Sequence, residues 1–221
     1  MKLAILLPGY LDSPDYLHFR IFEKRLNVLG YRVIRLDPCG LWRTGDINNY
    51  TITNYLKDIS EVINSHKNRN PEEIILIGHS LGGFVSIIAG SKFPEVTKIV
   101  ALCPPASYEK YLSKWKGQEY RYSKRDLPEN PQEFKKFQVP STFVLDAQKY
   151  SAIDEISRIN KPLMIFIGQE DTVVRPEVTE QLVTIANNPY VVREQGMGHS
   201  FRQSEDESNK VMDRIEKFLE E

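Results

Sequence analysis

A serine between two glycines is the feature of this sequence that points most directly to chemistry. Residues 78–82 read Gly-His-Ser-Leu-Gly, directly after an apolar run suited to a strand and directly before a stretch of helical period. In so tight a turn the serine backbone is strained, and the residues two positions before and after it must be small, as Gly78 and Gly82 are. The pattern predicts that the Ser80 hydroxyl is exposed at the carboxyl end of a sheet as a nucleophile. The simplest alternative is an ordinary serine at a helix N-terminus.

A serine hydroxyl is a weak nucleophile at neutral pH and needs a neighbouring base. His199 is the favoured candidate, because glycines flank it in a loop that follows the last apolar run and precedes the last helical stretch. His18 and His66 fall within helical stretches, and the turn is expected to point His79 away from Ser80. His199 is therefore predicted to be the general base. The alternative is a loop histidine held only by hydrogen bonds.

The base needs an acid to orient it. The apolar run 162–168 leads into Gln-Glu-Asp, which places Asp171 on a loop at the same edge of the sheet, with Glu170 as its closest rival. The loop after Leu102 has no carboxylate until Glu109. Asp171 is therefore predicted to hydrogen-bond the imidazole. The alternative is an aspartate that serves only as a turn or helix cap.

The first apolar run ends in Pro8-Gly9-Tyr10. A glycine here lets the backbone approach a substrate closely, so the Tyr10 amide is predicted to face the Leu81 amide across an acyl carbonyl oxygen. Two such donors would make an oxyanion hole. The alternative is an ordinary Pro-Gly turn.

These residues need elements that bring them to one edge, and the sequence alternates strands with helices. Short apolar runs typical of buried parallel strands fall at Leu3–Leu7, Tyr31–Leu36, Glu73–Gly78, Thr97–Leu102, Pro162–Gly168 and Tyr190–Glu194. Stretches of helical period fall at Tyr16–Leu29, Ile52–His66, Leu81–Phe93, Pro176–Asn187 and Ser204–Leu219. The order predicts an α/β fold, with a mostly parallel sheet and helices on both faces.

Length and composition bound the class of protein. The 221 residues suit a single domain, 1–221. Lys+Arg 29 against Asp+Glu 30 gives a net charge of −1, which lacks the basic excess of a nucleic-acid-binding protein. No apolar run is long enough for a membrane span or a signal peptide, so a soluble cytoplasmic protein is expected. Cys39 and Cys103 are expected to be reduced, and the scattered histidines predict no metal site.

One segment, 104–150, is too long to be an ordinary connection and shows no clear strand. It is expected to form short helices or a lid, and its many aromatic residues are typical of pocket walls. The alternative is a solvated helical excursion that its aromatics attach to the body. Its basic residues are expected either to meet an acidic substrate or to solvate the segment: Lys110, Lys114, Lys116, Arg121, Lys124 and Arg125.

The order Ser80, Asp171, His199, together with the serine turn and Pro8-Gly9-Tyr10, resembles the α/β-hydrolase superfamily along nearly the whole chain. Within it, the sequence is most similar to small bacterial carboxylesterases, both the cinnamoyl and feruloyl esterase-like group and the monoacylglycerol-lipase-like or serine-aminopeptidase-like group. The resemblance implies that 104–150 is a cap over the active site and that no cofactor is needed.

Two departures from that family stand out. The chain starts at what would be the family's third strand, so the resemblance implies a shortened sheet of about six strands. The edge left exposed is expected to suit a partner subunit, which makes a homodimer a candidate assembly. The usual His-Gly before the oxyanion loop is Pro8-Gly9 here.

The expected function is hydrolysis of carboxylic esters with small to medium or aryl acyl groups, through an acyl-enzyme on Ser80. An amidase or peptidase, a thioesterase and an acyltransferase would use a similar triad, and the motifs do not separate them. A non-catalytic ligand-binding protein on the same fold is the alternative from another class. It is disfavoured because Ser80, Asp171 and His199 are all present in order.

Overall fold

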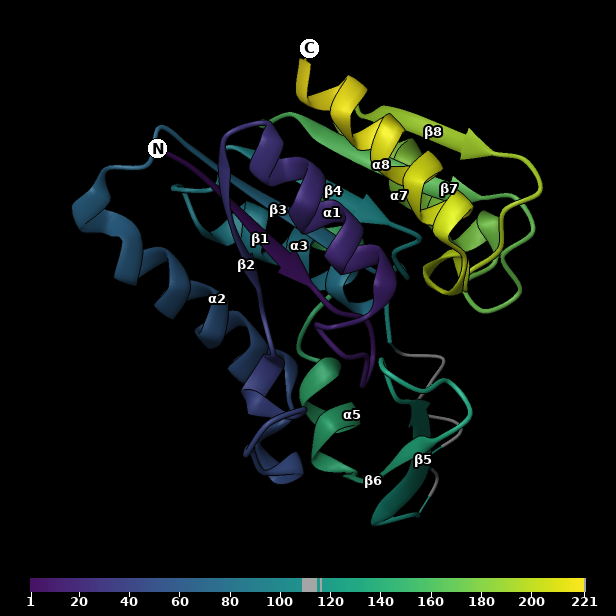
Figure 1. The fold of residues 1–221 in the computed structure, drawn as a ribbon. Helices are drawn as coiled ribbons and strands as arrows, with labels where there is room; N and C mark the ends of the chain where they lie inside the picture. The colour runs from purple at the N-terminus through teal and green to yellow at the C-terminus, as the bar shows by residue number, and fades with distance from the viewer. Residues whose placement is uncertain (109–114, 116, 221) are drawn as a thin grey trace.

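A six-stranded sheet forms the centre of the molecule in the computed structural model, which describes residues 1–108, 115 and 117–220 (Figure 1). The strand order is β2-β1-β3-β4-β7-β8, and every neighbouring pair is parallel. The strands are β1 Lys2–Leu7, β2 Tyr31–Arg35, β3 Glu73–His79, β4 Lys98–Leu102, β7 Leu163–Gly168 and β8 Tyr190–Glu194. All six predicted strands are confirmed, with ends that shift by a residue or so.

Helices connect these strands in the order that the sequence predicts. They are α1 Leu17–Val28, α2 Ile52–His66, α3 Leu81–Lys92, α5 Thr142–Ala147, α6 Ala152–Ile156, α7 Pro176–Ile185 and α8 Glu205–Glu220. Thr51 accepts a hydrogen bond from the Asn54 amide at the start of α2, and Pro176 stands in the first turn of α7, where its missing N–H costs nothing. Gly30 follows α1 in a left-handed conformation (φ 84°).

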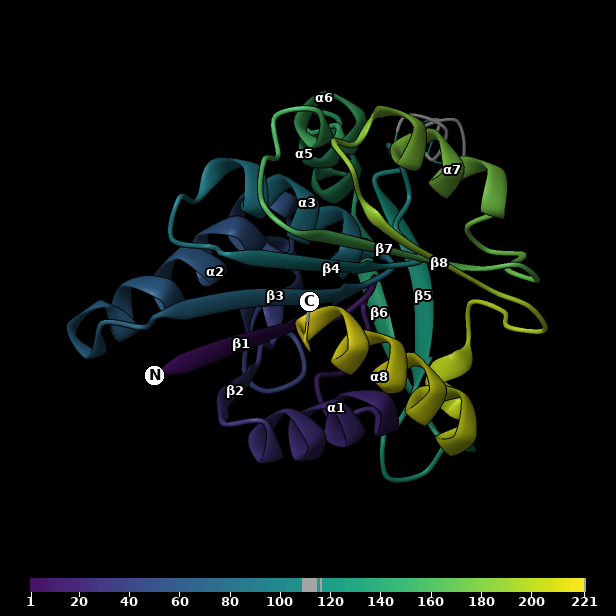
Figure 2. The same ribbon diagram turned by 90° about the horizontal axis from the view of Figure 1, so that it is seen from above.

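The sheet separates two hydrophobic cores, because successive strand residues point to opposite faces. Leu3, Ile5 and Leu7 of β1 pack on the side of α2, α3, α6 and α7, whereas Ala4 and Leu6 pack on the side of α1 and α8. Figure 2 shows these two layers of helices on either side of the strands. The predicted α/β fold with helices on both faces is confirmed.

The segment 104–150 contains a β-hairpin, so the expectation that it has no strand of its own was wrong. β5 Tyr120–Asp126 and β6 Phe134–Pro140 pair antiparallel, from Tyr120 opposite Pro140 to Asp126 opposite Phe134. The expected short helix is present as α5. The hairpin escapes a search for apolar runs because β5 alternates aromatic or lysine side chains with arginine and serine, so neither of its faces is aliphatic.

The hairpin and α5 lie beyond the carboxyl ends of the central strands (Figure 1). The contacts that join the hairpin to the body include the following three. Arg125 donates to the Tyr10 carbonyl at 2.7 Å, Arg202 pairs with Asp126 at 2.8 Å, and Lys135 donates to the Leu41 carbonyl at 2.7 Å. These contacts make the hairpin one wall of whatever site lies at that end of the sheet.

Two strands form the edges of the central sheet, β2 on one side and β8 on the other. The expectation of about six strands is confirmed, while the idea that a partner subunit covers an edge stays a prediction. Among the described residues, no helix is both long and apolar enough to cross a membrane.

Candidate active site

The turn from β3 into α3 holds Ser80 in a strained conformation, with φ 54° and ψ −117°. A Cβ on Gly78 would come within 2.1 Å of the Gly82 carbonyl oxygen, and a Cβ on Gly82 within 1.9 Å of the Leu7 carbonyl oxygen. Both glycines are therefore required for the chain to close this tightly, as the sequence predicts. The Ser80 amide donates to the Leu102 carbonyl at 2.8 Å, which fixes the turn to the neighbouring strand.

The loops after β7 and β8 are held together by their backbones. The Glu170 amide donates to the Met197 carbonyl at 2.9 Å, and a Cβ on Gly168 would come within 2.6 Å of that same oxygen. This close approach places Asp171 beside His199: Oδ2 of the aspartate lies 2.6 Å from Nδ1 of the imidazole. The structure thus brings together the two residues that the sequence places 28 positions apart.

The Asp171 carboxylate is buried, and both of its oxygens are used. Oδ1 accepts hydrogen bonds from the Val173 and Val174 amides, each at 2.8 Å, and Oδ2 faces His199. Its sequence rival Glu170 is exposed. A carboxylate fixed by two amides is well suited to hold one orientation of an imidazole.

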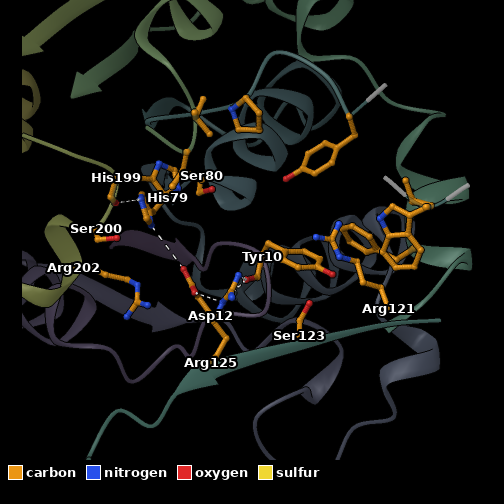
Figure 3. A pocket seen from close by; sticks show the side chains of 17 residues that line it. Tyr10, Asp12, His79, Ser80, Arg121, Ser123, Arg125, His199, Ser200 and Arg202 are labelled. Carbon is orange, nitrogen blue, oxygen red and sulfur yellow. Dashed lines mark hydrogen bonds and ion pairs between the residues drawn. The ribbon is translucent and has the colours of Figure 1, made fainter. Parts of the chain in front are cut away.

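A cavity of about 420 Å³ brings Ser80 and His199 into one site (Figure 3). One part of its wall is apolar or aromatic: Pro105, Tyr108, Trp115, Phe143, Val144, Val173 and Val174. The remainder is polar and includes three arginines and one aspartate: Arg121, Arg125, Arg202 and Asp12. The cavity lies between the carboxyl ends of the central strands and the hairpin, where ligands bind in open α/β sheets.

Comparison with known proteins places the chain in a family. A family model described as serine aminopeptidase, S33, matches residues 3–135, more than half of the chain. The chain belongs to this family of α/β hydrolases. The matched residues include Ser80 and the Tyr10 turn but end before Asp171 and His199. No protein with curated annotation matches the sequence.

Solved structures agree on the fold. Est1E from Butyrivibrio proteoclasticus, solved with ferulic acid bound, superposes with a TM-score of 0.80 at 20% identity, covering 99% of the hydrolase and 88% of Est1E. The mouse alpha/beta hydrolase domain-containing protein 10 gives 0.76 at 17% identity, covering 99% and 89%. The esterase domain of a Rhodothermus marinus protein gives 0.70 at 19% identity, covering 97% and 84%. At such identities the likeness establishes the fold, and the predicted resemblance to α/β hydrolases is confirmed.

Two backbone amides of the hydrolase were expected to form an oxyanion hole. Tyr10 lines the cavity, and its carbonyl is held by two nitrogens of Arg125, Nε at 3.0 Å and Nη2 at 2.7 Å. Leu81 is the first residue of α3. Neither amide N–H donates to an acceptor among the described residues, so both stay available to a ligand. The assignment of the oxyanion hole remains a prediction.

His79 also lines the cavity, while the expectation that it points away from Ser80 stays a prediction. Its side chain is buried against His199, with ring centroids 4.8 Å apart, and its Nε2 lies 3.1 Å from the His199 carbonyl oxygen. Behind it, His18 is fully buried and neither ring nitrogen has a hydrogen-bond partner among the described residues. Burial lowers the pKa of both His79 and His18 well below the ordinary value, so both rings are neutral.

The sequence did not predict that three residues of one strand, β5, line the cavity of the hydrolase. Arg121, Ser123 and Arg125 all line it, whereas Lys124 between them faces outward. The signal was present as strict alternation in Tyr-Arg-Tyr-Ser-Lys-Arg, a period of two that a strand requires. Of the basic residues noted in this segment, Lys110, Lys114 and Lys116 lie outside the described residues.

One group of side chains has the spacing of a metal site. Cys103, Asp171 and His199 each offer an atom within 4.8 Å of the others. Burial raises the pKa of the Cys103 thiol, so the thiol stays protonated, and the other two side chains are bonded to each other. This donor set fits an acid–base pair better than a metal, because binding an ion would require both a thiolate and a broken Asp–His hydrogen bond.

Proposed function

We propose that this protein is a serine hydrolase that cleaves carboxylic esters through Ser80, His199 and Asp171. The observation that carries the proposal is the shared cavity: Ser80 stands there in its strained turn beside His199, whose Nδ1 is bonded to a buried aspartate at 2.6 Å. Strained backbone at a cavity and a carboxylate behind an imidazole are both typical of nucleophilic catalysis.

In the first step, His199 Nε2 accepts the Ser80 hydroxyl proton as Oγ attacks the acyl carbonyl carbon. Asp171 keeps the second proton of the imidazole on Nδ1 and stabilises the positive charge that develops on the ring. The Tyr10 and Leu81 amides donate to the oxyanion, in a site that preorganises them before the reaction. Collapse of the intermediate releases the alcohol, which takes the proton from His199, and leaves the acyl group on Ser80.

In the second step, His199 takes a proton from water, which attacks the acyl-enzyme through the same oxyanion hole. Departure of the acid returns the proton to Ser80 Oγ. Neither step calls for a cofactor.

The size and lining of the cavity support the proposal that the substrates are esters with small to medium or aryl acyl groups. A volume of about 420 Å³ with an aromatic and aliphatic wall suits such a group. The structural relative solved with ferulic acid, an aryl acid, gives the aryl reading further support.

An aminopeptidase reading follows from the name of the family, but the cavity favours it less. Recognition of a peptide α-ammonium calls for a free carboxylate. Among the described lining residues Asp12 is the one that is acidic, and it is already paired with Arg125 at 3.1 Å. Amide, thioester and acyl-transfer chemistry use the same triad, so the ester assignment depends on turnover measurements.

The first test is covalent labelling with a fluorophosphonate probe. We expect modification of Ser80, loss of labelling in Ser80→Ala, and full labelling in Ser91→Ala, which removes a hydroxyl from the far end of the same helix. Mass spectrometry of the labelled peptide locates the site. Absence of labelling in folded protein would refute the triad and favour a non-catalytic binding protein.

The second test is a p-nitrophenyl ester series from acetate to dodecanoate together with a cinnamoyl ester. We expect turnover with an optimum at short to medium chains or at the aryl ester. Labelling without turnover of any ester would instead favour amidase, thioesterase or acyltransferase chemistry.

A further inference from the structure

Strand β5 carries one arginine, Arg121, into the cavity that no carboxylate of the described residues neutralises. Arg125 pairs with Asp12 at 3.1 Å, and Arg202 pairs with Asp126 at 2.8 Å. Arg121 forms no ion pair and no side-chain hydrogen bond with any residue that the structure describes. Counted over the residues that the structure describes, the cavity wall therefore holds one uncompensated positive charge.

The position of Arg121 is fixed by the hairpin. Alternation along β5 places it on the same face as Ser123 and Arg125, and all three side chains line the cavity. In Figure 3 the side chain of Arg121 reaches inward from the side opposite Ser80 and His199. A ligand that contacts both Ser80 and Arg121 must therefore span the cavity.

A partly buried guanidinium without a partner is costly, since it has lost part of its hydration without gaining a counter-charge. Arginines at such sites ordinarily bind a carboxylate or phosphate through two parallel hydrogen bonds. A single unmatched charge balances a carboxylate, whereas a phosphate ester with nearly two negative charges would leave an excess of negative charge. The charge balance favours a carboxylate ligand.

The cavity wall also includes Phe143, Val144 and Tyr108, which suit a hydrocarbon chain or ring. We propose that Arg121 binds a free carboxylate of the substrate, so that the preferred esters are monoesters of dicarboxylic acids. This inference rests on the proposed ester hydrolysis and names the substrate class for the same site.

The test compares two esters of equal shape. Monoethyl adipate ends in a carboxylate, and ethyl 6-methylheptanoate ends in an isopropyl group of the same branching. In the wild type we expect kcat/KM for the anionic ester to exceed that for the neutral one by at least about tenfold. Arg121→Gln should reduce this ratio by about 10–100-fold, the effect of losing charge-assisted hydrogen bonds.

Two further variants separate recognition from a general charge effect. Lys124→Gln removes the same charge from the outward face of the same strand, so the ratio should stay at its wild-type value. Arg121→Lys keeps the charge but loses the planar fork, so its ratio should fall between those of the wild type and Arg121→Gln. Equal ratios in the wild type and Arg121→Gln, or an equal fall in Lys124→Gln, would overturn the proposal.

A binding measurement keeps this inference separate from the proposed function. Calorimetry of monoethyl adipate with Ser80→Ala needs no turnover, and the Kd should rise at least about tenfold when Arg121→Gln is added, with circular dichroism checking that each variant is folded. Binding that depends on Arg121 without any ester turnover would support the anion site while the ester reaction fails. Turnover of neutral esters, with no dependence on Arg121 in either assay, would support the ester reaction and overturn the anion site.

Discussion

The orientation of His199 depends on a carboxylate that is itself held in place. One oxygen of Asp171 accepts hydrogen bonds from two backbone amides, and the other is hydrogen-bonded to the imidazole. The Asp171 side chain is only 1% exposed. His199 is further fixed through its carbonyl by the buried His79 ring. Such support holds the imidazole in one orientation and favours the tautomer with its proton on Nδ1.

Asp171→Asn should lower kcat about 10³–10⁴-fold. An amide in that place stabilises the wrong tautomer of His199 and does not stabilise the positive charge that develops on the imidazole during the reaction. Glu170→Gln changes the exposed neighbouring carboxylate and should stay within about twofold of wild type. Steady-state kinetics with the best p-nitrophenyl ester measures both. A loss in Glu170→Gln equal to that in Asp171→Asn would contradict the assignment of the acid.

The β5–β6 hairpin supplies a part of the cavity wall that lies outside the central sheet. Its contact with the body depends on Asp126. The Asp126 carboxylate accepts hydrogen bonds from two guanidinium nitrogens of Arg202 and lies 3.2 Å from the Tyr16 hydroxyl. Although burial opposes it, the Arg202 guanidinium holds the pKa of Asp126 below its ordinary value. The pair joins the hairpin to the loop that follows His199.

Asp126→Asn should weaken this contact by roughly 1–3 kcal/mol, since Arg202 would lose its charged partner in a mostly buried place. We expect faster hydrogen exchange in β5 and β6 and a higher KM, with unchanged exchange in the central strands. Glu129→Gln, which breaks an exposed pair between the hairpin loop and Arg20, is the matched control and should change neither. Faster exchange throughout the molecule would mean that the pair stabilises the whole fold instead.

For the whole molecule, two buried histidines set a dependence of stability on pH. His18, the second residue of α1, packs among Phe19, Phe22 and Phe201, and the ring centroids of His18 and His79 lie 5.7 Å apart. Burial, followed by the charge of Arg202, lowers the pKa of His18. In the unfolded chain each ring would take up a proton near its ordinary pKa of about 6.5.

The unfolded state therefore binds more protons below that pH, so the free energy of unfolding should fall as pH drops from 7 to 5. Each histidine contributes up to about 1.4 kcal/mol per pH unit. His18→Leu removes one of the two, and its free energy of unfolding should depend less steeply on pH than that of the wild type. Urea denaturation at pH 7, 6 and 5 measures this slope, and equal slopes in both proteins would exclude His18 as a source.

The six central strands and the candidate Ser80 turn could be predicted from the sequence for local reasons. Buried parallel strands need unbroken apolar runs such as Leu3–Leu7, and a strand-to-helix turn as tight as that at Ser80 needs glycine on both sides. These requirements are met within a few residues of each position, so they can be read without knowing the rest of the fold.

The contacts that these residues make could not be predicted, because they depend on how distant parts of the chain pack. The 2.6 Å approach of Asp171 to His199 depends on two loops packing against each other, and the inward face of β5 depends on where the hairpin lies against the body. The inward face of β5 carries arginine and serine because it lines a partly polar cavity wall. The strand therefore lacks the apolar residues by which a buried strand is predicted from sequence. Contacts between distant residues are set by packing. Packing also gives Arg125 and Arg202 a carboxylate partner each, while Arg121 has none among the described residues.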